Sequence, residues 1–170
     1  KQGELVVHDE HGIGRYEDHP GLDFSEFERL PDTRRIRQQH GLDGRSVLLS
    51  VGRLAKRKGI PEFVKHCMPT VVEKHPDTVY LVVGGNPTDS LSHKEDVRGQ
   101  IERTVSELQL ENHVRLLGRI ERDRLIDLYH ACDVFVLPAI PVAGDMEGFG
   151  IVLTEAAAAG KPVVSPRLGG

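Results

Sequence analysis

Four basic side chains follow the first long apolar run of the sequence and could bind an anion together. The loop after the run SVLLSVG contains Arg53, Lys56, Arg57 and Lys58. Because Pro61 suits the first turn of a helix, these cations are expected in front of a helix N-terminus. That end of a helix carries partial positive charge, so four cations are unfavourable there unless an anion such as phosphate completes the site. A solvated basic loop explains the charge pattern alone equally well.

A second segment, DMEGFGIVLTEAAAAGKPVV (145–164), places two carboxylates, Glu147 and Glu155, around a Gly-Phe-Gly turn. The glycines let the backbone approach a ligand closely. An anion-binding nest at the helix start would be formed by the backbone amides of Phe149, Gly150 and Ile151. Each carboxylate alone has a plainer interpretation, Glu147 as an acid that stabilises the helix dipole and Glu155 as an exposed helix residue. The presence of both beside a basic loop favours a ligand site.

Strands and helices alternate from residue 46 onward, which places both segments in loops between a strand and a helix. The expected strands are the apolar runs 46–52, 78–85, 113–118, 134–139 and 162–166. The expected helices between them span residues 61–74, 97–108, 125–132 and 150–159. This alternation predicts an α/β fold with a doubly wound parallel sheet covered on both faces. Ligands of such sheets bind beyond the carboxyl ends of the strands.

Residues 1–45 are less regular than the rest of the chain. A charged helix is expected across residues 31–40 and an extra strand at residues 5–8. We therefore divide the chain into a linker with the first elements of the domain (1–45) and the domain proper (46–170). Because the sequence opens at Lys1 without Met and ends at Gly170 directly after an apolar strand, we expect a piece of a longer protein.

Composition excludes several classes of protein. The chain has 170 residues, 38% of them hydrophobic, which is enough for one core, and its net charge of −4 does not suggest a nucleic-acid or membrane-surface binder. No apolar run approaches the roughly 18 residues of a membrane span. Cys67 and Cys132 are expected to be buried free thiols, which favours the cytoplasm. His8 and His11 are a weak zinc signal, so no bound metal is expected.

The ordered set of motifs resembles the GT-B glycosyltransferases of family 4, which include mannosyltransferases that act on phosphoinositides. Their C-terminal, Rossmann-like domain carries a basic R-x4-KG loop, an LG turn and an E-x7-E motif, written here as EGFGIVLTE. The stretch HPGLDFSEF (19–27) is similar to the lead-in P-N-G-V-D-x3-F, with Gly21 matching its glycine and His19 and Leu22 departing from it. The resemblance covers residues 46–170 continuously.

The resemblance implies which residues bind the donor. Arg53 and Lys58 would hold its diphosphate and stabilise the charge on the leaving nucleotide. Glu147 would contact the sugar hydroxyls, and Glu155 would accept hydrogen bonds from the ribose. Backbone amides for the sugar and phosphate would come from Phe149, Gly150 and Ile151. The turn that reads the base would be Gly118, Arg119 and Ile120.

Other residues near these motifs have no clear role in the family pattern. Lys56 and Arg57 match no assigned position, so a solvated loop is the better interpretation for both. Gly84 and Gly85 end the second strand where the family has a glycine loop, but a glycine pair after a strand is also typical of a plain turn.

The function that the resemblance implies is that of a retaining glycosyltransferase, which moves a sugar from a UDP- or GDP-linked donor to an acceptor hydroxyl. No cofactor or metal is implied, because basic residues and the helix dipole balance the diphosphate. A separate N-terminal domain would bind an acceptor glycan or lipid. The present chain alone should therefore be inactive, and the full-length enzyme could associate peripherally with a membrane.

Two other functions are compatible with a domain of this type. A dinucleotide-dependent enzyme is disfavoured because no GxGxxG stands between a strand and a helix, and the Walker spacing GxxxxGK[ST] is also absent. A non-catalytic nucleotide-binding or regulatory domain of the same fold is the remaining alternative. The intact set Arg53, Lys58, Glu147 and Glu155 argues against it.

Overall fold

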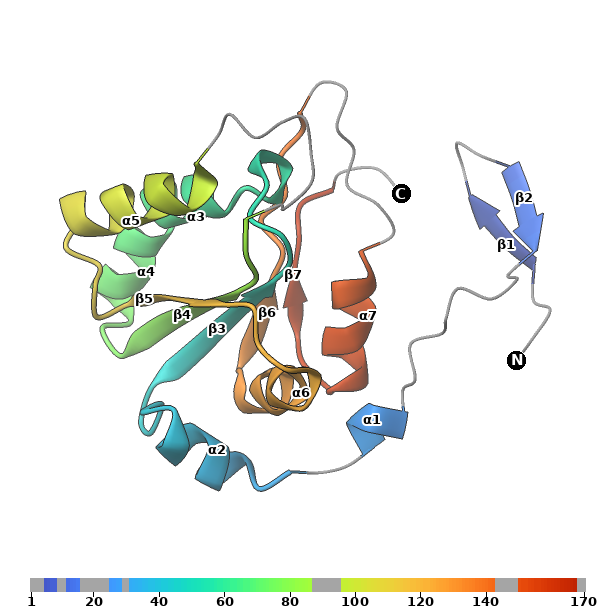
Figure 1. Cartoon of the computed structure of the whole chain (residues 1–170), viewed down its shortest axis with the longest axis horizontal. Coiled ribbons are helices and arrows are strands. Elements are labelled where there is room, and N and C mark those ends of the chain that lie inside the picture. Colours follow the sequence, from blue (N-terminus) through green and yellow to red (C-terminus); the bar gives the residue numbers. More distant parts are fainter. Residues whose placement is uncertain are drawn as a thin grey trace.

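Five parallel strands form the central sheet of the protein (Figure 1). The computed structural model describes residues 5–8, 12–15, 25–28, 31–86, 96–142 and 150–167. Every strand pairing in the central sheet is parallel, and the strand order is β5-β4-β3-β6-β7. The strands are β3 (Ser46–Val51), β4 (Thr78–Val83), β5 (Val114–Gly118), β6 (Val134–Val136) and β7 (Val163–Val164). All five predicted strands are therefore confirmed, although β6 and β7 are shorter than predicted.

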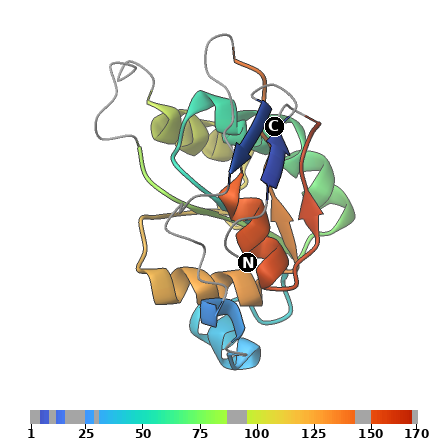
Figure 2. The same cartoon turned by 90° about the vertical axis from the view of Figure 1, so that its right-hand side faces the viewer.

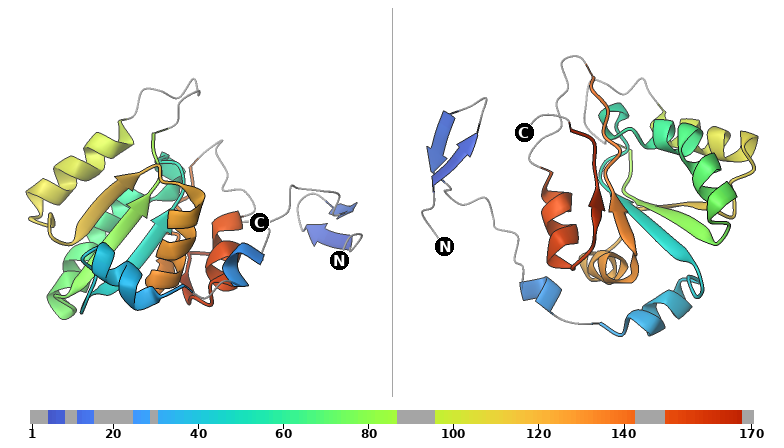
Figure 3. Two further views of the ribbon diagram at one scale, coloured as in Figure 1. Left: turned by 60° about the horizontal axis from the view of Figure 1, so that its bottom comes forward. Right: turned by 180° about the vertical axis from the view of Figure 1, so that it is seen from behind.

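Helices cover both faces of this sheet, as the doubly wound prediction requires (Figure 1 and Figure 3). One face carries α3 (Ile60–His66), α4 (Met68–Lys74) and α5 (Val97–Glu107). The other face carries α6 (Arg122–Ala131) and α7 (Ile151–Ala158). The short helix α2 (Thr33–Gln39) packs against α6 (Figure 2), and α1 (Ser25–Glu28) contacts α7.

The burial of β4 on both faces explains why its sequence is a continuous apolar run. All six residues of β4 are buried, and they alternate between two cores. Val79, Leu81 and Val83 join the core under α6 and α7, whereas Tyr80 and Val82 join the core under α3, α4 and α5. The edge strand β7 differs from the prediction, because both of its valines are exposed. Among the described helices, α7 contacts β7, but the Val163 and Val164 side chains stay exposed to solvent beside it.

The predicted single helix over residues 61–74 is wrong. The segment forms two helices, α3 and α4, which meet at Cys67. Pro69 lies in the first turn of α4, where its missing N–H costs nothing; in a continuous helix it would remove a hydrogen bond and crowd the preceding turn. The prediction of two buried thiols is half right. Cys67 is exposed, whereas burial raises the pKa of the Cys132 thiol to about 12.

The first part of the chain holds a separate hairpin. The predicted strand at residues 5–8 is confirmed as β1 (Leu5–His8), but it pairs antiparallel with β2 (Gly12–Arg15) in a sheet of its own. The predicted charged helix is confirmed as α2, and Asp32 caps it by accepting a hydrogen bond from the Arg35 amide at 3.0 Å. The boundary at residue 45 stays a prediction. Among the described residues, no helix is long and apolar enough to cross a membrane.

The backbones at the ends of β3 and β4 approach each other closely at two glycines. The Gly52 amide donates to the Val83 carbonyl at 2.9 Å. At Gly84, where φ is 138°, a Cβ atom would lie 1.8 Å from the Gly52 carbonyl oxygen. Because that neighbour is backbone of an adjacent strand, it has little freedom to move, and Gly84 must lack a side chain.

We predict that Gly84→Ala lowers the free energy of unfolding by about 3 kcal/mol, through backbone strain and overlap with Gly52. Gly44→Ala is the matched control, because Gly44 also has a positive φ, 69°, but has open space around its Cβ position. Strain alone should cost it about 1 kcal/mol. Urea unfolding of both variants measures the difference, and equal losses would show that the contact with Gly52 is unimportant.

Candidate functional site

A row of glycines lines the carboxyl edge of the sheet. The Gly84 amide donates to the Gly118 carbonyl at 2.8 Å, and the Leu54 amide donates to the Gly85 carbonyl at 3.0 Å. Gly118 has a φ of 68° and open space at its Cβ position. These glycines contribute only backbone at the ends of β3, β4 and β5, which allows a ligand a close approach there.

The predicted basic loop follows β3 and lies where the strand order reverses. The chain runs outward from β3 to β4 and β5 and then returns to β6 on the other side. The Ile140 amide, after β6, donates to the Arg57 carbonyl at 2.9 Å. A Cβ atom on Gly59 would lie 1.9 Å from the Pro138 carbonyl oxygen. The loop is thus fixed at the switch point of the sheet, the usual ligand crevice of doubly wound folds.

The structure separates the four cations of this loop. Residues Lys56–Lys58 form a short 3-10 turn, and Lys58 is buried, with 8% of its surface exposed. Its Cε and Nζ atoms lie 3.3 Å and 3.6 Å from the Cβ position of Gly52, so the ammonium end lies beside the end of β3. Arg53 and Lys56 are exposed. Arg57 is half-buried. The Lys58 side chain is thus placed directly at the carboxyl edge of the sheet.

The turn after β5 borders a cavity of about 320 Å³. Arg119 is exposed and lies against Gly85, with its Cγ 3.4 Å from the Cβ position of that glycine. Burial, and next the charge of Arg124, lower the pKa of His40 in the cavity wall. The cavity is lined by His40, Leu117, Arg119, Ile120, Glu121, Arg124 and Leu128. Its wall therefore combines three apolar side chains with four polar or charged ones.

Glu155 is buried, with 6% of its surface exposed, so its interpretation as an exposed helix residue is wrong. The Tyr129 hydroxyl donates to Glu155 Oε2 at 2.7 Å, and Arg122 Nη1 donates to Oε1 at 2.5 Å. The sequence places Tyr129 only within the expected helix 125–132 and does not single out Arg122. No local pattern connects either residue with a carboxylate more than twenty positions away.

The start of α7 is partly described. Gly150 has a left-handed conformation, φ 60° and ψ 40°, and no side chain caps the helix. Ile151 is 49% exposed. The first-turn amides of a helix have no intrahelical partner, so a ligand can use them. The predicted roles of Glu147 and Phe149 lie outside the described residues.

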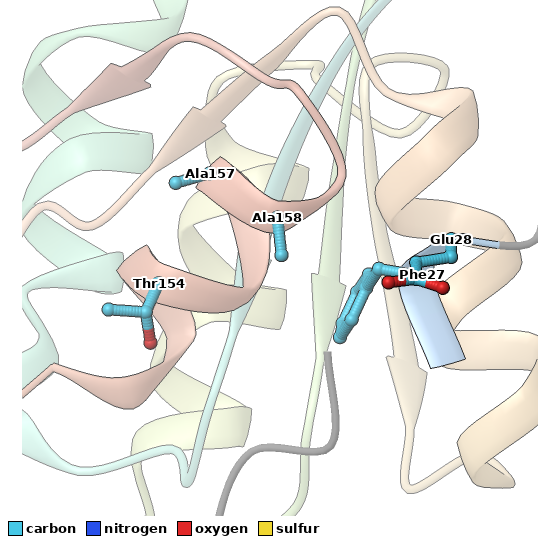
Figure 4. A pocket seen from close by; sticks show the side chains of 5 residues that line it. All are labelled: Phe27, Glu28, Thr154, Ala157 and Ala158. Carbon is cyan, nitrogen blue, oxygen red and sulfur yellow. The ribbon is translucent and has the colours of Figure 1, made fainter. Parts of the chain in front are cut away.

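A second cavity, of about 440 Å³, lies between α1 and α7 (Figure 4). In Figure 4 the Phe27 ring points from α1 toward α7. The lining residues are Phe27, Glu28, Thr154, Ala157 and Ala158. This lining is mostly apolar, includes one acid and contains none of the predicted site residues, so its chemistry suits a diphosphate poorly. Over the described ranges, no group of three or more histidine, cysteine or acidic residues could hold a metal ion.

The fold and this edge of the sheet define a Rossmann-like domain of the GT-B type. A family model described as "Glycosyl transferases group 1" matches residues 32–170. The chain therefore belongs to the group 1 glycosyltransferase family.

Curated relatives agree with this assignment. The chain is 36% identical over 154 residues to the GDP-mannose-dependent α-(1-6)-phosphatidylinositol monomannoside mannosyltransferase of Mycolicibacterium smegmatis, covering 89% of this chain and 38% of the relative. It is 33% identical to the mannosylfructose-phosphate synthase of Agrobacterium fabrum, covering 97% of this chain and 36% of that protein. The chain thus spans well under half the length of these relatives.

A solved structure shares the fold. Anabaena HepE in complex with UDP-glucose superposes with a TM-score of 0.72 at 28% identity, covering 88% of this chain and 38% of the other. The same protein has also been solved with UDP.

Proposed function

We propose that this chain is the donor-binding domain of a retaining, family 4 glycosyltransferase, which transfers a sugar from a UDP- or GDP-linked donor to an acceptor hydroxyl. The observation that carries the proposal is the placement of Lys58. This buried cation lies beside Gly52 at the switch point of a glycine-lined sheet edge. An ammonium group at this position suits the diphosphate of a donor, because cations bind phosphate through charge-assisted hydrogen bonds. The bound UDP-glucose of Anabaena HepE and the GDP-mannose dependence of the mycobacterial relative support the donor class.

Each part of the donor has a place in this proposal. Lys58 and Arg53 hold the diphosphate, Glu155 accepts hydrogen bonds from the ribose, and Glu147 contacts the sugar. The base lies beside the turn after β5, in the cavity that Arg119 and Ile120 line. Amides for the sugar and phosphate come from Phe149, Gly150 and Ile151.

The chemistry breaks the bond between the anomeric carbon and the β-phosphate oxygen and forms a bond from the same carbon to the acceptor oxygen. The acceptor hydroxyl loses its proton, and the nucleoside diphosphate leaves with an added negative charge. Lys58 and Arg53 stabilise that charge, which is larger in the transition state than in the bound donor. In this proposal the two cations and the α7 N-terminus, rather than a metal or cofactor, balance the diphosphate.

The remaining parts of the proposal concern the longer protein. Residues 46–170 form the donor domain, and an N-terminal domain binds the acceptor glycan or lipid and allows peripheral membrane association. The relatives are long enough for such a second domain, because this chain covers 38% of the mycobacterial mannosyltransferase. We place the protein in the cytoplasm, where Cys67 and Cys132, both free, stay reduced.

We predict that Lys58→Met and Arg53→Ala each weaken the binding of GDP or UDP roughly ten-fold, because each removes a charge-assisted hydrogen bond. Methionine keeps the alkyl chain that packs beside Gly52. Lys56→Ala is the matched control, an exposed cation of the same loop, and should change binding less than about two-fold. Calorimetry compares the three variants. Equal effects at all three positions would reduce the site to nonspecific charge.

The chain alone should bind a nucleotide but transfer no sugar. Binding needs the sheet edge, whereas transfer also needs an acceptor held against the donor, which depends on a second domain closing the cleft. Incubation with GDP-mannose or UDP-glucose and a panel of acceptors, beside the full-length enzyme, measures both properties. Transfer by the chain at a rate comparable to that of the full-length enzyme would contradict the two-domain proposal.

A further inference from the structure

The carboxylate of Glu155 is held by two side chains of the neighbouring helix α6. Tyr129 donates to one oxygen and Arg122 to the other, at 2.7 Å and 2.5 Å. The Glu155 side chain is 8% exposed, so its charge is almost fully withdrawn from water. Burial of a charge is tolerated when the charge is paired and hydrogen-bonded. Tyr129 and Arg122 supply both conditions.

The direction of these hydrogen bonds is fixed. Burial, and next the charge of Glu155, raise the pKa of Tyr129, so its hydroxyl keeps its proton and acts as the donor. Burial acts to lower the pKa of Arg122, but its hydrogen bonds to Glu155 and Glu26 outweigh that effect and raise it. A carboxylate offers about four acceptor positions. Of the described residues, Tyr129 and Arg122 each donate to one oxygen. Two donors leave both oxygens with acceptor capacity that a ligand can use.

Arg122 is itself held in place. Its Nε donates to Glu26 of α1 at 2.9 Å, and its guanidinium lies 5.5 Å from the centre of the Phe27 ring. Phe27 also packs edge-on against Tyr129, with ring centres 5.8 Å apart. Three helices, α1, α6 and α7, therefore meet around the Glu155 carboxylate and leave it little freedom to rotate.

We propose that Tyr129 and Arg122 are positioning residues that orient the Glu155 carboxylate toward the ribose hydroxyls of the donor. This inference rests on the proposed function, in which Glu155 binds the ribose. Both residues touch Glu155 from the side of α6 and act through it. Their loss should therefore weaken the binding only of ligands whose hydroxyls donate hydrogen bonds to Glu155. This selectivity distinguishes a positioning role from a general structural role.

The test is Tyr129→Phe, which removes one hydroxyl and preserves the ring. Calorimetry measures the dissociation constants of GDP, UDP and their 2′,3′-dideoxy counterparts for the wild-type chain and the variant. The variant should bind the ribonucleotides about three- to ten-fold more weakly, the effect of one hydrogen bond to a charged group, and the dideoxy nucleotides within about two-fold of wild type.

Tyr80→Phe is the matched control. Tyr80 is also fully buried, and its hydroxyl lies 2.6 Å from Ser50 Oγ in the core on the other face of the sheet. This variant loses a buried hydroxyl without touching Glu155. Its preference for ribonucleotides over dideoxy nucleotides should equal that of wild type.

Two further variants complete the test. Arg122→Lys keeps a positive charge but lacks the planar fork that joins Glu26 and Glu155, so it should lose part of the ribose preference. In a Glu155→Gln background, Tyr129→Phe should change the ribose preference little further, because Tyr129 acts through the carboxylate that this background lacks.

The outcomes separate this inference from the proposed function. A wild-type chain that binds none of these nucleotides at millimolar concentration would overturn both. The positioning role alone would be overturned if the wild-type chain prefers ribonucleotides and the Tyr129→Phe variant keeps that full preference. The same holds if the variant binds all four nucleotides more weakly by the same factor.

Discussion

Backbone packs directly on backbone where β3 and β4 end, and the candidate site depends on that contact. Gly84 can approach the Gly52 carbonyl because Gly84 carries no side chain. The absence of a side chain at Gly52 leaves room for the buried end of Lys58. A side chain at Gly84 would separate the strand ends, and one at Gly52 would crowd the lysine. In this protein the glycines thus leave room for a ligand at the carboxyl edge, where parallel sheets usually bind their ligands.

Among the described residues, two charged side chains near the candidate site, Glu155 and Lys58, are buried. Glu155 is compensated by Tyr129 and Arg122 within the protein, so the fold is stable with its carboxylate buried. Lys58 is held by the 3-10 turn, which Gly59 and the segment after β6 fix in place. An anionic diphosphate with a hydroxyl-bearing ribose complements both groups, and this complementarity links the fold to the proposed donor.

Much of the fold could be predicted because its signals are local. Apolar runs, β-branched residues and the stop at Gly160 are enough to predict β3, β4 and α7. The break at Cys67 is harder to predict, because Pro69 is compatible with the first turn of a new helix as well as with a kink in a longer one. The site was harder to predict. The motif R-x4-KG singles out Lys58 rather than Lys56, but the burial of Lys58 depends on tertiary contacts that no local pattern shows. The partners of Glu155 lie 33 and 26 positions away, beyond any spacing rule.

A crystal structure of the chain with bound GDP or UDP tests the central claim most directly. The account predicts that the diphosphate lies at the glycine-lined edge, with a phosphate oxygen within hydrogen-bonding distance of Lys58 Nζ, and that the ribose hydroxyls donate to Glu155. A nucleotide bound elsewhere, for example in the cavity between α1 and α7, with neither Lys58 nor Glu155 in contact, would contradict it.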